Sequence, residues 1–320
     1  MQNSAQTGKS GPLIKQKQKA SRGRGTFKKN GFLYLLLMPA LLLTLIFKYV
    51  PMYGAVIAFK EFSPIRGILN SEWAGFKYFE KFLLSPNFEV IFMNTLKLSF
   101  YGLLFGFPIP ILLALMLNQV RKAGAKKNIQ LFLYAPNFVS VVVIAGMLFI
   151  FLSPTGPINA IATWIFGQPL MFMTDPAYFR WVYILSDIWA TAGWASIIYV
   201  AALAGVDPEL HNAASLDGAS LMRRIWHIDL PTIKPIMAIV FILAAGGIMS
   251  IGFEKAYLLQ TSMNLPSSEI IATYVYKVGL QSGDYSYSAA VGLFNSVINV
   301  ILLLTVNFVV KKLNDNQGLY

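Results

Sequence analysis

The chain has 320 residues, a mean hydropathy of +0.58 and a net charge of +12. Hydrophobic residues make up 56% of it and charged residues 12%, about half of the roughly 25% found in soluble domains. So few charges could not cover so much apolar surface in water, which excludes a soluble enzyme, a soluble nucleic-acid-binding domain and a disordered protein. The composition predicts an all-α membrane protein with several spans.

Apolar stretches long enough to cross about 30 Å of hydrocarbon as helices of about 20 residues recur along the chain. They cover residues 31–50, about 95–117, 131–152, 181–203, 236–258 and 286–310. No alternating β-barrel pattern is present, so we expect six transmembrane helices. The run 31–50 exceeds a typical signal-peptide core and lacks an A-x-A site, which favours a retained span.

Lys and Arg residues are distributed unevenly between the two sides that these spans define. One side holds 17 of them and the other six. The positive-inside rule therefore predicts both termini in the cytoplasm. We expect a basic cytoplasmic tail over 1–30, a transmembrane domain over 31–312 and a cytoplasmic tail over 313–320. The basic tail is expected to lie near anionic membrane lipid, not to bind nucleic acid.

Sequence patterns that would indicate a nucleotide, metal or catalytic site are weak in this chain. Gly8-Lys9-Ser10 resembles the end of a phosphate-binding loop, but Asn3 stands where an earlier glycine is required. The chain has no cysteine, and its two histidines, His211 and His227, do not have zinc-ligand spacing. We therefore expect no catalytic residue, no metal site and no cofactor in this chain.

The connection 204–235 is the most informative segment. We expect Asp207 to cap a short helix that begins at Pro208 and is broken at Asp217-Gly218, where glycine permits positive φ. A second short helix is expected over about 219–228. Leu230-Pro231 should end it, and Pro235 should start the fifth span. The result would be a helical hairpin with a tip of small residues that could enter a groove.

This hairpin resembles the coupling loop of ABC importer permeases, in which E-A-A-x-x-D-G-A is followed about nine residues later by I-x-L-P. The resemblance implies that the loop docks on a cytoplasmic ATPase, whereas the alternative is a solvated hairpin without a partner. Asn212 replaces the first glutamate of the pattern. The residues expected to couple to the ATPase are Glu209, Asn212, Ala213, Ala214, Asp217, Gly218, Ala219, Ile228, Leu230 and Pro231.

Other segments resemble the sugar-class permeases, in particular the subgroup that imports oligosaccharides derived from polysaccharides. They are Trp73-Ala74-Gly75-Phe76-Lys77-Tyr78-Phe79 ahead of Asn94-Thr95, the run 153–159, Gly252-Phe253-Glu254-Lys255 and the run 291–296. The resemblance covers about 31–312. It implies a bacterial cytoplasmic-membrane permease that pairs with a second homologous permease. It also implies two cytoplasmic ATPase subunits that hold ATP and Mg, and an extracytoplasmic sugar-binding protein that delivers an oligosaccharide.

Residues near the expected spans are candidates for the sugar pathway. Asp187 lies inside the fourth span, where an acid is costly and usually faces a cavity or a partner. Both a pathway role and a structural hydrogen bond remain open for it. Glu254 and Lys255 could line an outer cavity, form an interfacial ion pair or contact the binding protein. Gly246 with Ser250 should allow close helix packing. The full candidate set is Asp187, Trp189, Glu254, Lys255 and Asn295.

The sequence fits two other classes of membrane protein less well. A secondary transporter driven by an ion gradient would require an internal repeat and paired carboxylates near the midplane, and only Asp187 lies clearly near mid-span. A membrane-bound enzyme would require a catalytic constellation, which the sequence lacks. We therefore expect a permease subunit of an ATP-driven oligosaccharide importer that works by alternating access and hydrolyses no ATP itself.

Overall fold

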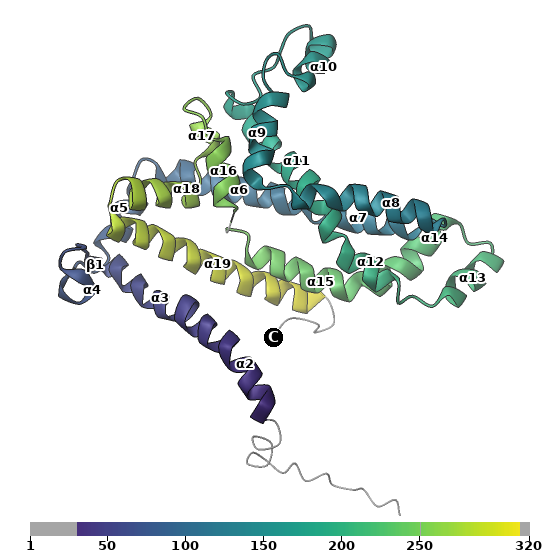
Figure 1. Cartoon of the computed structure of the whole chain (residues 1–320), viewed down its shortest axis with the longest axis horizontal. Helices are drawn as coiled ribbons and strands as arrows, with labels where there is room; N and C mark the ends of the chain where they lie inside the picture. Colours follow the sequence, from purple (N-terminus) through teal and green to yellow (C-terminus); the bar gives the residue numbers. More distant parts are fainter. Residues whose placement is uncertain (1–30, 250, 314–320) are drawn as a thin grey trace, which may run out of the picture. The chain divides into compact units, whose positions relative to one another are not determined.

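The computed structural model describes residues 31–249 and 251–313 (Figure 1). The expected basic tail over 1–30, Ser250 and residues 314–320 of the expected C-terminal tail lie outside the described residues. The chain divides into two units, Met1–Gly54 and Ala55–Tyr320.

The described part of the first unit is an apolar helix. It runs through α2 (Gly31–Thr44), the π turn η1 (Leu45–Tyr49) and α3 (Val50–Met52), and no residue in these elements is buried. Apolar side chains occupy all sides of it, which is typical of a membrane span. With η2 (Tyr53–Phe59) the helix covers 29 residues, Gly31–Phe59. The expected first span is confirmed and is longer than predicted.

The second unit consists of helices and one short ribbon, in which β1 (Lys60–Glu61) pairs antiparallel with β2 (Glu72–Trp73). Its longer helices are α6 (Phe88–Gly106), α7 (Pro108–Asn118), α8 (Ala123–Tyr134), α9 (Val141–Phe151), α10 (Pro157–Phe166), α11 (Pro176–Ala195), α15 (Leu230–Gly246) and α19 (Tyr285–Leu313). Its shorter elements are α4 (Gly67–Asn70), α5 (Lys77–Leu83), η3 (Ala135–Phe138), α12 (Ile197–Leu203), α13 (Pro208–Leu216), α14 (Leu221–Arg224), η4 (Ile225–Asp229), α16 (Phe253–Leu259), α17 (Leu265–Ser268), α18 (Ile271–Tyr276) and η5 (Lys277–Gln281).

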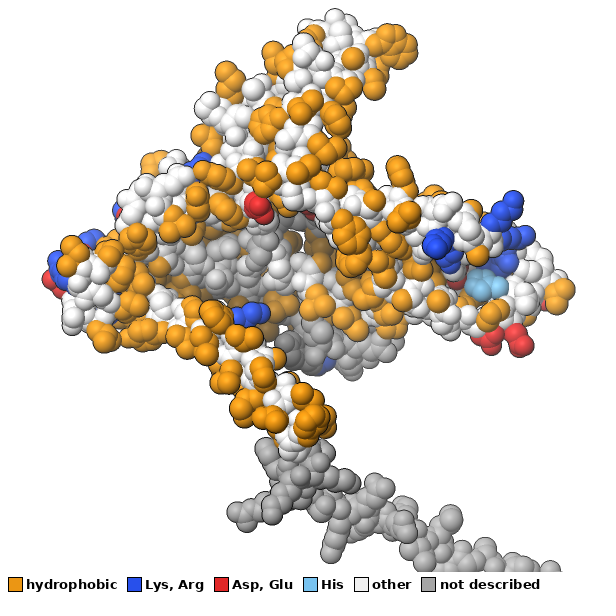
Figure 2. Space-filling view, in the orientation of Figure 1, with side chains coloured by type: hydrophobic (Ala, Val, Ile, Leu, Met, Phe, Trp, Pro, Cys, Tyr) orange, Lys and Arg blue, Asp and Glu red, His pale blue; other side chains and the backbone are white. Residues whose placement is uncertain are grey.

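Within the described residues, five helices are long and apolar enough to cross a membrane, and a bent pair can supply a sixth span. Besides the first span they are Phe88–Asn118, Pro176–Leu203, Leu221–Gly246 and Tyr285–Lys312. Figure 2 shows hydrophobic side chains exposed along these helices, as expected of surfaces that face lipid or other subunits. The all-α, polytopic architecture is therefore as predicted.

The third span is not the straight helix that the sequence predicted. The helix Ala123–Phe138 and α9 meet at an angle of 98°. Pro136 lies in the last turn before the break, where its ring and missing N–H disfavour a continued helix. Ser140 then starts α9, because its side chain accepts a hydrogen bond from the Val143 amide at 3.3 Å.

The fifth span also differs from the prediction of a helix over 236–258. The helix begins at Leu221, continues without interruption through η4 into α15, and ends at Gly246. Neither Pro231 nor Pro235 stops it. The π turn of η4, in which the Leu230 amide donates to the Ile225 carbonyl, widens the helix next to Pro231 and relieves the usual clash. Gly246 followed by Gly247 ends the helix instead, as expected for residues that lack a stabilising side chain.

Small buried clusters hold these helices together. One joins α6, α11 and α16 through Leu98, Ile184 and Leu259. A second joins α5, α18 and α19, and a third joins α7, α12 and α15. In Figure 1 α15 and α19 run side by side, and a Cβ on Gly246 would stand 2.5 Å from Leu303 Cδ1. Close packing at Gly246 is thus confirmed.

Candidate functional site

A cavity of about 550 Å³ lies between α6, α7, α11, α15 and α16, and we call it the charged cavity. Its wall contains Asp187, Glu254 and Lys255. Lys255 Nζ donates to Asp187 Oδ1 at 3.1 Å and to the Tyr183 carbonyl at 2.9 Å. The Lys255 side chain is 9% exposed and that of Asp187 53%. The ammonium group is therefore held inside the wall, while the carboxylate remains accessible.

The remaining lining of the charged cavity is mixed. Ser99, Thr191 and Tyr199 contribute hydroxyl-bearing side chains, and Leu98, Phe107 and Ile251 contribute apolar ones. Apolar walls with a few convergent polar groups are typical of sites that bind small molecules. The arrangement can hydrogen-bond to a polar ligand.

The structure brings together Asp187, Glu254 and Lys255 but not the other two pathway candidates. Trp189 lines a separate apolar hollow of about 540 Å³ between α9 and α11. Asn295, on α19, donates to the Met249 carbonyl at 3.4 Å. Asp187 forms an ion pair with Lys255 and also lines the charged cavity, so both its pathway role and its structural role stay predictions.

The first half of the hairpin in 204–235 has the predicted local structure. Asp207 accepts a hydrogen bond from the Glu209 amide at 2.9 Å and caps α13, with Pro208 in its first turn. The helix ends at Leu216 with Asp217 as its C-cap, and Gly218 has a φ of +75°. The Ala219 amide then donates to the Ala214 carbonyl at 2.9 Å, which closes the helix end.

The second half of the hairpin is different. Ser220 caps a helix at its first turn, α14, by accepting from the Arg223 amide at 3.4 Å. This helix does not end at Leu230-Pro231 but continues into the fifth span. Ile228, Leu230 and Pro231 therefore lie on the membrane helix itself, whereas the other expected coupling residues lie on α13 and its break. Figure 2 shows basic side chains gathered around α13 and α14.

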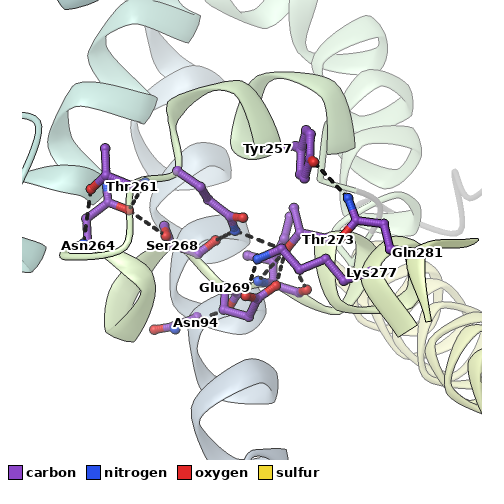
Figure 3. A network of polar contacts seen from close by, with 11 residues as sticks. Asn94, Tyr257, Thr261, Asn264, Ser268, Glu269, Thr273, Lys277 and Gln281 are labelled. Atoms are coloured by element: carbon purple, nitrogen blue, oxygen red, sulfur yellow. Dashed lines mark hydrogen bonds and ion pairs between the residues drawn. The ribbon is translucent and has the colours of Figure 1, made fainter. Parts of the chain in front are cut away.

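A polar network between α16 and α18 had not been predicted (Figure 3). Asn264 is buried, donates to the Met173 and Leu259 carbonyls, and accepts from the Thr261 amide and the Ser268 hydroxyl. Lys277 Nζ lies 2.6 Å from Glu269 Oε2. Asn94 of α6 donates to the Pro266 carbonyl at 2.9 Å. The network holds the segment between α16 and α18 against α6. The only feature of the sequence that could have indicated this network is a run of polar residues in apolar surroundings.

Comparison with known proteins decides the family. Residues 106–315 match the model described as "Binding-protein-dependent transport system inner membrane component". The chain belongs to this family. The permease is 46% identical over 294 residues to Protein LplB of Bacillus subtilis (strain 168), with 92% of each chain covered. It is 42% identical over 309 residues to the polygalacturonan/rhamnogalacturonan transport system permease protein YteP of that organism, with 96% of each covered.

Solved structures agree with this assignment. The permease resembles a chain in the crystal structure of a bacterial alginate ABC transporter in complex with an alginate pentasaccharide-bound periplasmic protein. The TM-score is 0.83 at 38% identity, over 92% of this chain and 99% of that chain. A crystal structure of a bacterial ABC transporter involved in import of the acidic polysaccharide alginate gives a TM-score of 0.82, also at 38% identity, over 91% and 98% of the two chains. The expected ABC importer permease fold is confirmed, and the comparisons give no support to an ion-gradient-driven transporter.

Proposed function

We propose that this permease is a membrane subunit of an ATP-driven importer of oligosaccharides. The observation that carries the proposal is the likeness, over 92% of the chain, to an alginate transporter in complex with a pentasaccharide-bound periplasmic protein. The relative YteP, named for polygalacturonan and rhamnogalacturonan transport, supports a polysaccharide-derived substrate. The chain itself would hydrolyse no ATP.

The proposed assembly has three kinds of partner. A second homologous permease would complete the translocation pathway. Two cytoplasmic ATPase subunits would hold ATP and Mg and supply the energy. An extracytoplasmic sugar-binding protein would deliver the oligosaccharide. Both termini would lie in the cytoplasm, in accordance with the distribution of Lys and Arg.

The hairpin α13–α14 is the proposed contact with the ATPases. Its helix α13 has no buried residue, so most of the helix surface away from His211 is available to a partner. Asn212, Ala213 and Gly218 are exposed, and the left-handed turn at Gly218 exposes small residues at the tip. Closure of the ATPase dimer would move α13 and switch the permease pair between inward-facing and outward-facing states. The two states must differ in their contacts at both ends for this coupling to operate.

The charged cavity is the proposed sugar pathway within this subunit. Asp187 is the accessible carboxylate of its ion pair with Lys255, and it would accept hydrogen bonds from sugar hydroxyl groups. Glu254 and the hydroxyl groups of the wall would add further polar contacts. Trp189 and Asn295 do not line this cavity.

The decisive experiment reconstitutes the tagged permease in proteoliposomes together with the ABC-transporter subunits that neighbouring genes encode. We expect the ATPase to copurify, and uptake of an oligogalacturonate or alginate pentasaccharide probe to require internal ATP, Mg and the binding protein. A matched preparation with galacto-oligosaccharide would report selectivity. Uptake driven by an imposed ion gradient without ATP, or permease recovered without any ATPase, would contradict the proposal.

A further inference from the structure

Asp229 is a fully buried carboxylate at the base of the hairpin, and its side chain is 0% exposed. His211 Nε2 lies 3.2 Å from Asp229 Oδ1. Gln119 Nε2 donates to Asp229 Oδ2 at 3.3 Å, and Asn118 Nδ2 lies 3.5 Å from Oδ1. A buried carboxylate is tolerated only when such donors satisfy it. We call these four residues the Asp229 cluster.

The Asp229 cluster joins three elements that are distant in sequence. His211 lies on α13, Asp229 ends η4 where the fifth span enters α15, and Asn118 with Gln119 ends α7 of the second span. One carboxylate therefore links the proposed coupling helix to the ends of two membrane helices. Loss of any donor would leave part of the buried carboxylate without a hydrogen bond, which is unfavourable. Moving any one of the three elements away from the others would therefore raise the free energy of the fold.

Apolar packing does not provide an equivalent link for α13. The large apolar side chains on this helix, Leu210 and Leu216, are 54% and 90% exposed. A second polar link exists, in which Arg224 Nη1 donates to Ser215 Oγ at 2.7 Å, but it reaches only α14. Among the hydrogen bonds and ion pairs of the described residues, those of the Asp229 cluster connect α13 to α7.

We propose that His211 and Asp229 are positioning residues that make α13 move as one body with the inner ends of the second and fifth spans. This inference rests on the proposed function, because it assigns a route for movement imposed by an ATPase. When the ATPase shifts α13, the shared carboxylate would transfer that shift to α7 and α15. Without the His211 contact, α13 could move while α7 remained in place.

The test measures whether α13 and α7 keep a fixed distance. The chain has no native cysteine, so spin labels can be placed at Leu210→Cys on α13 and Met116→Cys on α7, both exposed positions. The labelled permease is assembled with its partner permease and ATPases in nanodiscs. Distances between the labels are measured by pulsed electron resonance in the nucleotide-free and the ADP–vanadate-trapped states.

We expect one narrow distance that is the same in both states when His211 is present. His211→Leu should broaden the distribution and shift its mean between the states, while the ATPase still copurifies. His211→Gln, whose amide nitrogen can replace Nε2, should restore the narrow distance. Asn118→Ala combined with Gln119→Ala should reproduce the broadening from the α7 side. His227→Leu is the matched control, since His227 Nδ1 contacts only the Arg223 carbonyl of its own helix among the contacts described.

An unchanged narrow distance in His211→Leu, or a broad distance in His211→Gln, would overturn the inference while the ATPase is retained. Failure of the unlabelled permease to retain any ATPase would instead overturn the proposed function, and this inference with it.

Discussion

A Cβ atom on Gly193 would stand 2.0 Å from the carbonyl oxygen of Leu133. The glycine therefore allows α11 to pack directly on the backbone of α8, next to the bend of the third span. Rotation of a side chain cannot relieve this contact, because the two nearest atoms are the carbonyl oxygen and carbon of Leu133. This close approach has a direct consequence for stability.

Gly193→Ala is expected to destabilise the permease by about 1–3 kcal/mol, because the added methyl group must push two helices apart. The measurement is thermal unfolding of the detergent-solubilised protein together with its yield. Gly146→Ala on α9 is the matched control, since no atom lies within 4 Å of a Cβ at that position. Equal melting temperatures for the two variants would contradict the packing argument.

Asp187→Asn is expected to reduce oligosaccharide uptake more than assembly. The variant retains a hydrogen-bonding side chain in the cavity wall, but the Lys255 ammonium loses its charged partner and keeps the carbonyl and the ring of Tyr183. Because Asp187 is about half exposed, the structural cost should be modest, of the order of 1 kcal/mol. Uptake and complex yield are measured on the same preparation. Normal uptake with a reduced yield would assign Asp187 a structural role only.

Gly218→Asp is expected to abolish uptake and to lower recovery of the ATPase with the permease. Within this chain the substitution costs about 1 kcal/mol of backbone strain at positive φ, since no atom lies within 4 Å of a Cβ there. A larger effect must therefore arise from a partner that meets the tip. Copurification from solubilised membranes, with permease quantified in parallel, measures it.

The control for this variant is Gly283→Asp, because Gly283 has a φ of +74° and equally open surroundings. It should retain the ATPase. Full ATPase recovery and normal uptake for Gly218→Asp would remove the hairpin from the proposed coupling role.

Ala213→Asp should act in the same direction as Gly218→Asp, because it adds bulk and charge to the exposed face of α13. Asn212→Glu should be tolerated, since it restores the residue of the coupling-loop pattern. Both variants are compared in the copurification assay. Loss of the ATPase in Asn212→Glu alone would show that this hairpin contacts its partner differently from the pattern.

Single cysteines at Ser4 and Ser262 are expected to be labelled from opposite sides of the membrane. The prediction follows from the distribution of Lys and Arg, and the absence of native cysteine provides a clean background. An impermeant maleimide applied to intact cells and to inverted vesicles makes the measurement. Labelling of both positions from one side would refute the topology.

The sequence predicted correctly those elements whose conformation depends on residues close together in the chain. The Asp207 cap, Pro208 and the turn at Gly218 appeared as expected, because capping and positive φ depend on a few neighbouring residues. Apolar length located the spans for the same reason. These features required no knowledge of packing.

The features that were missed depend on residues far apart in the chain. The length of an apolar run does not indicate a bend. The sequence therefore predicted a straight span where the structure has a 98° break near Pro136. Pro231 suggested a helix end, but a π turn accommodates it. The pairing of Asp187 with Lys255 joins positions 68 residues apart, and the donors that meet Asp229 come from elements that only the fold brings together. Sequence spacing carries no signal for such contacts.

The uninterrupted helix from Leu221 to Gly246 has a mechanical consequence. Its 26 residues, at about 1.5 Å each, make a rod of about 39 Å, so a tilt of about 10° at one end displaces the other by about 7 Å. The end at Leu221 carries the hairpin, and the other end, at Gly246, adjoins Gly247 in the wall of the charged cavity. Had Pro231 broken the helix, a hinge would have absorbed the tilt; because the π turn keeps the helix continuous, a small rotation at the hairpin becomes a displacement of several ångströms at the cavity wall.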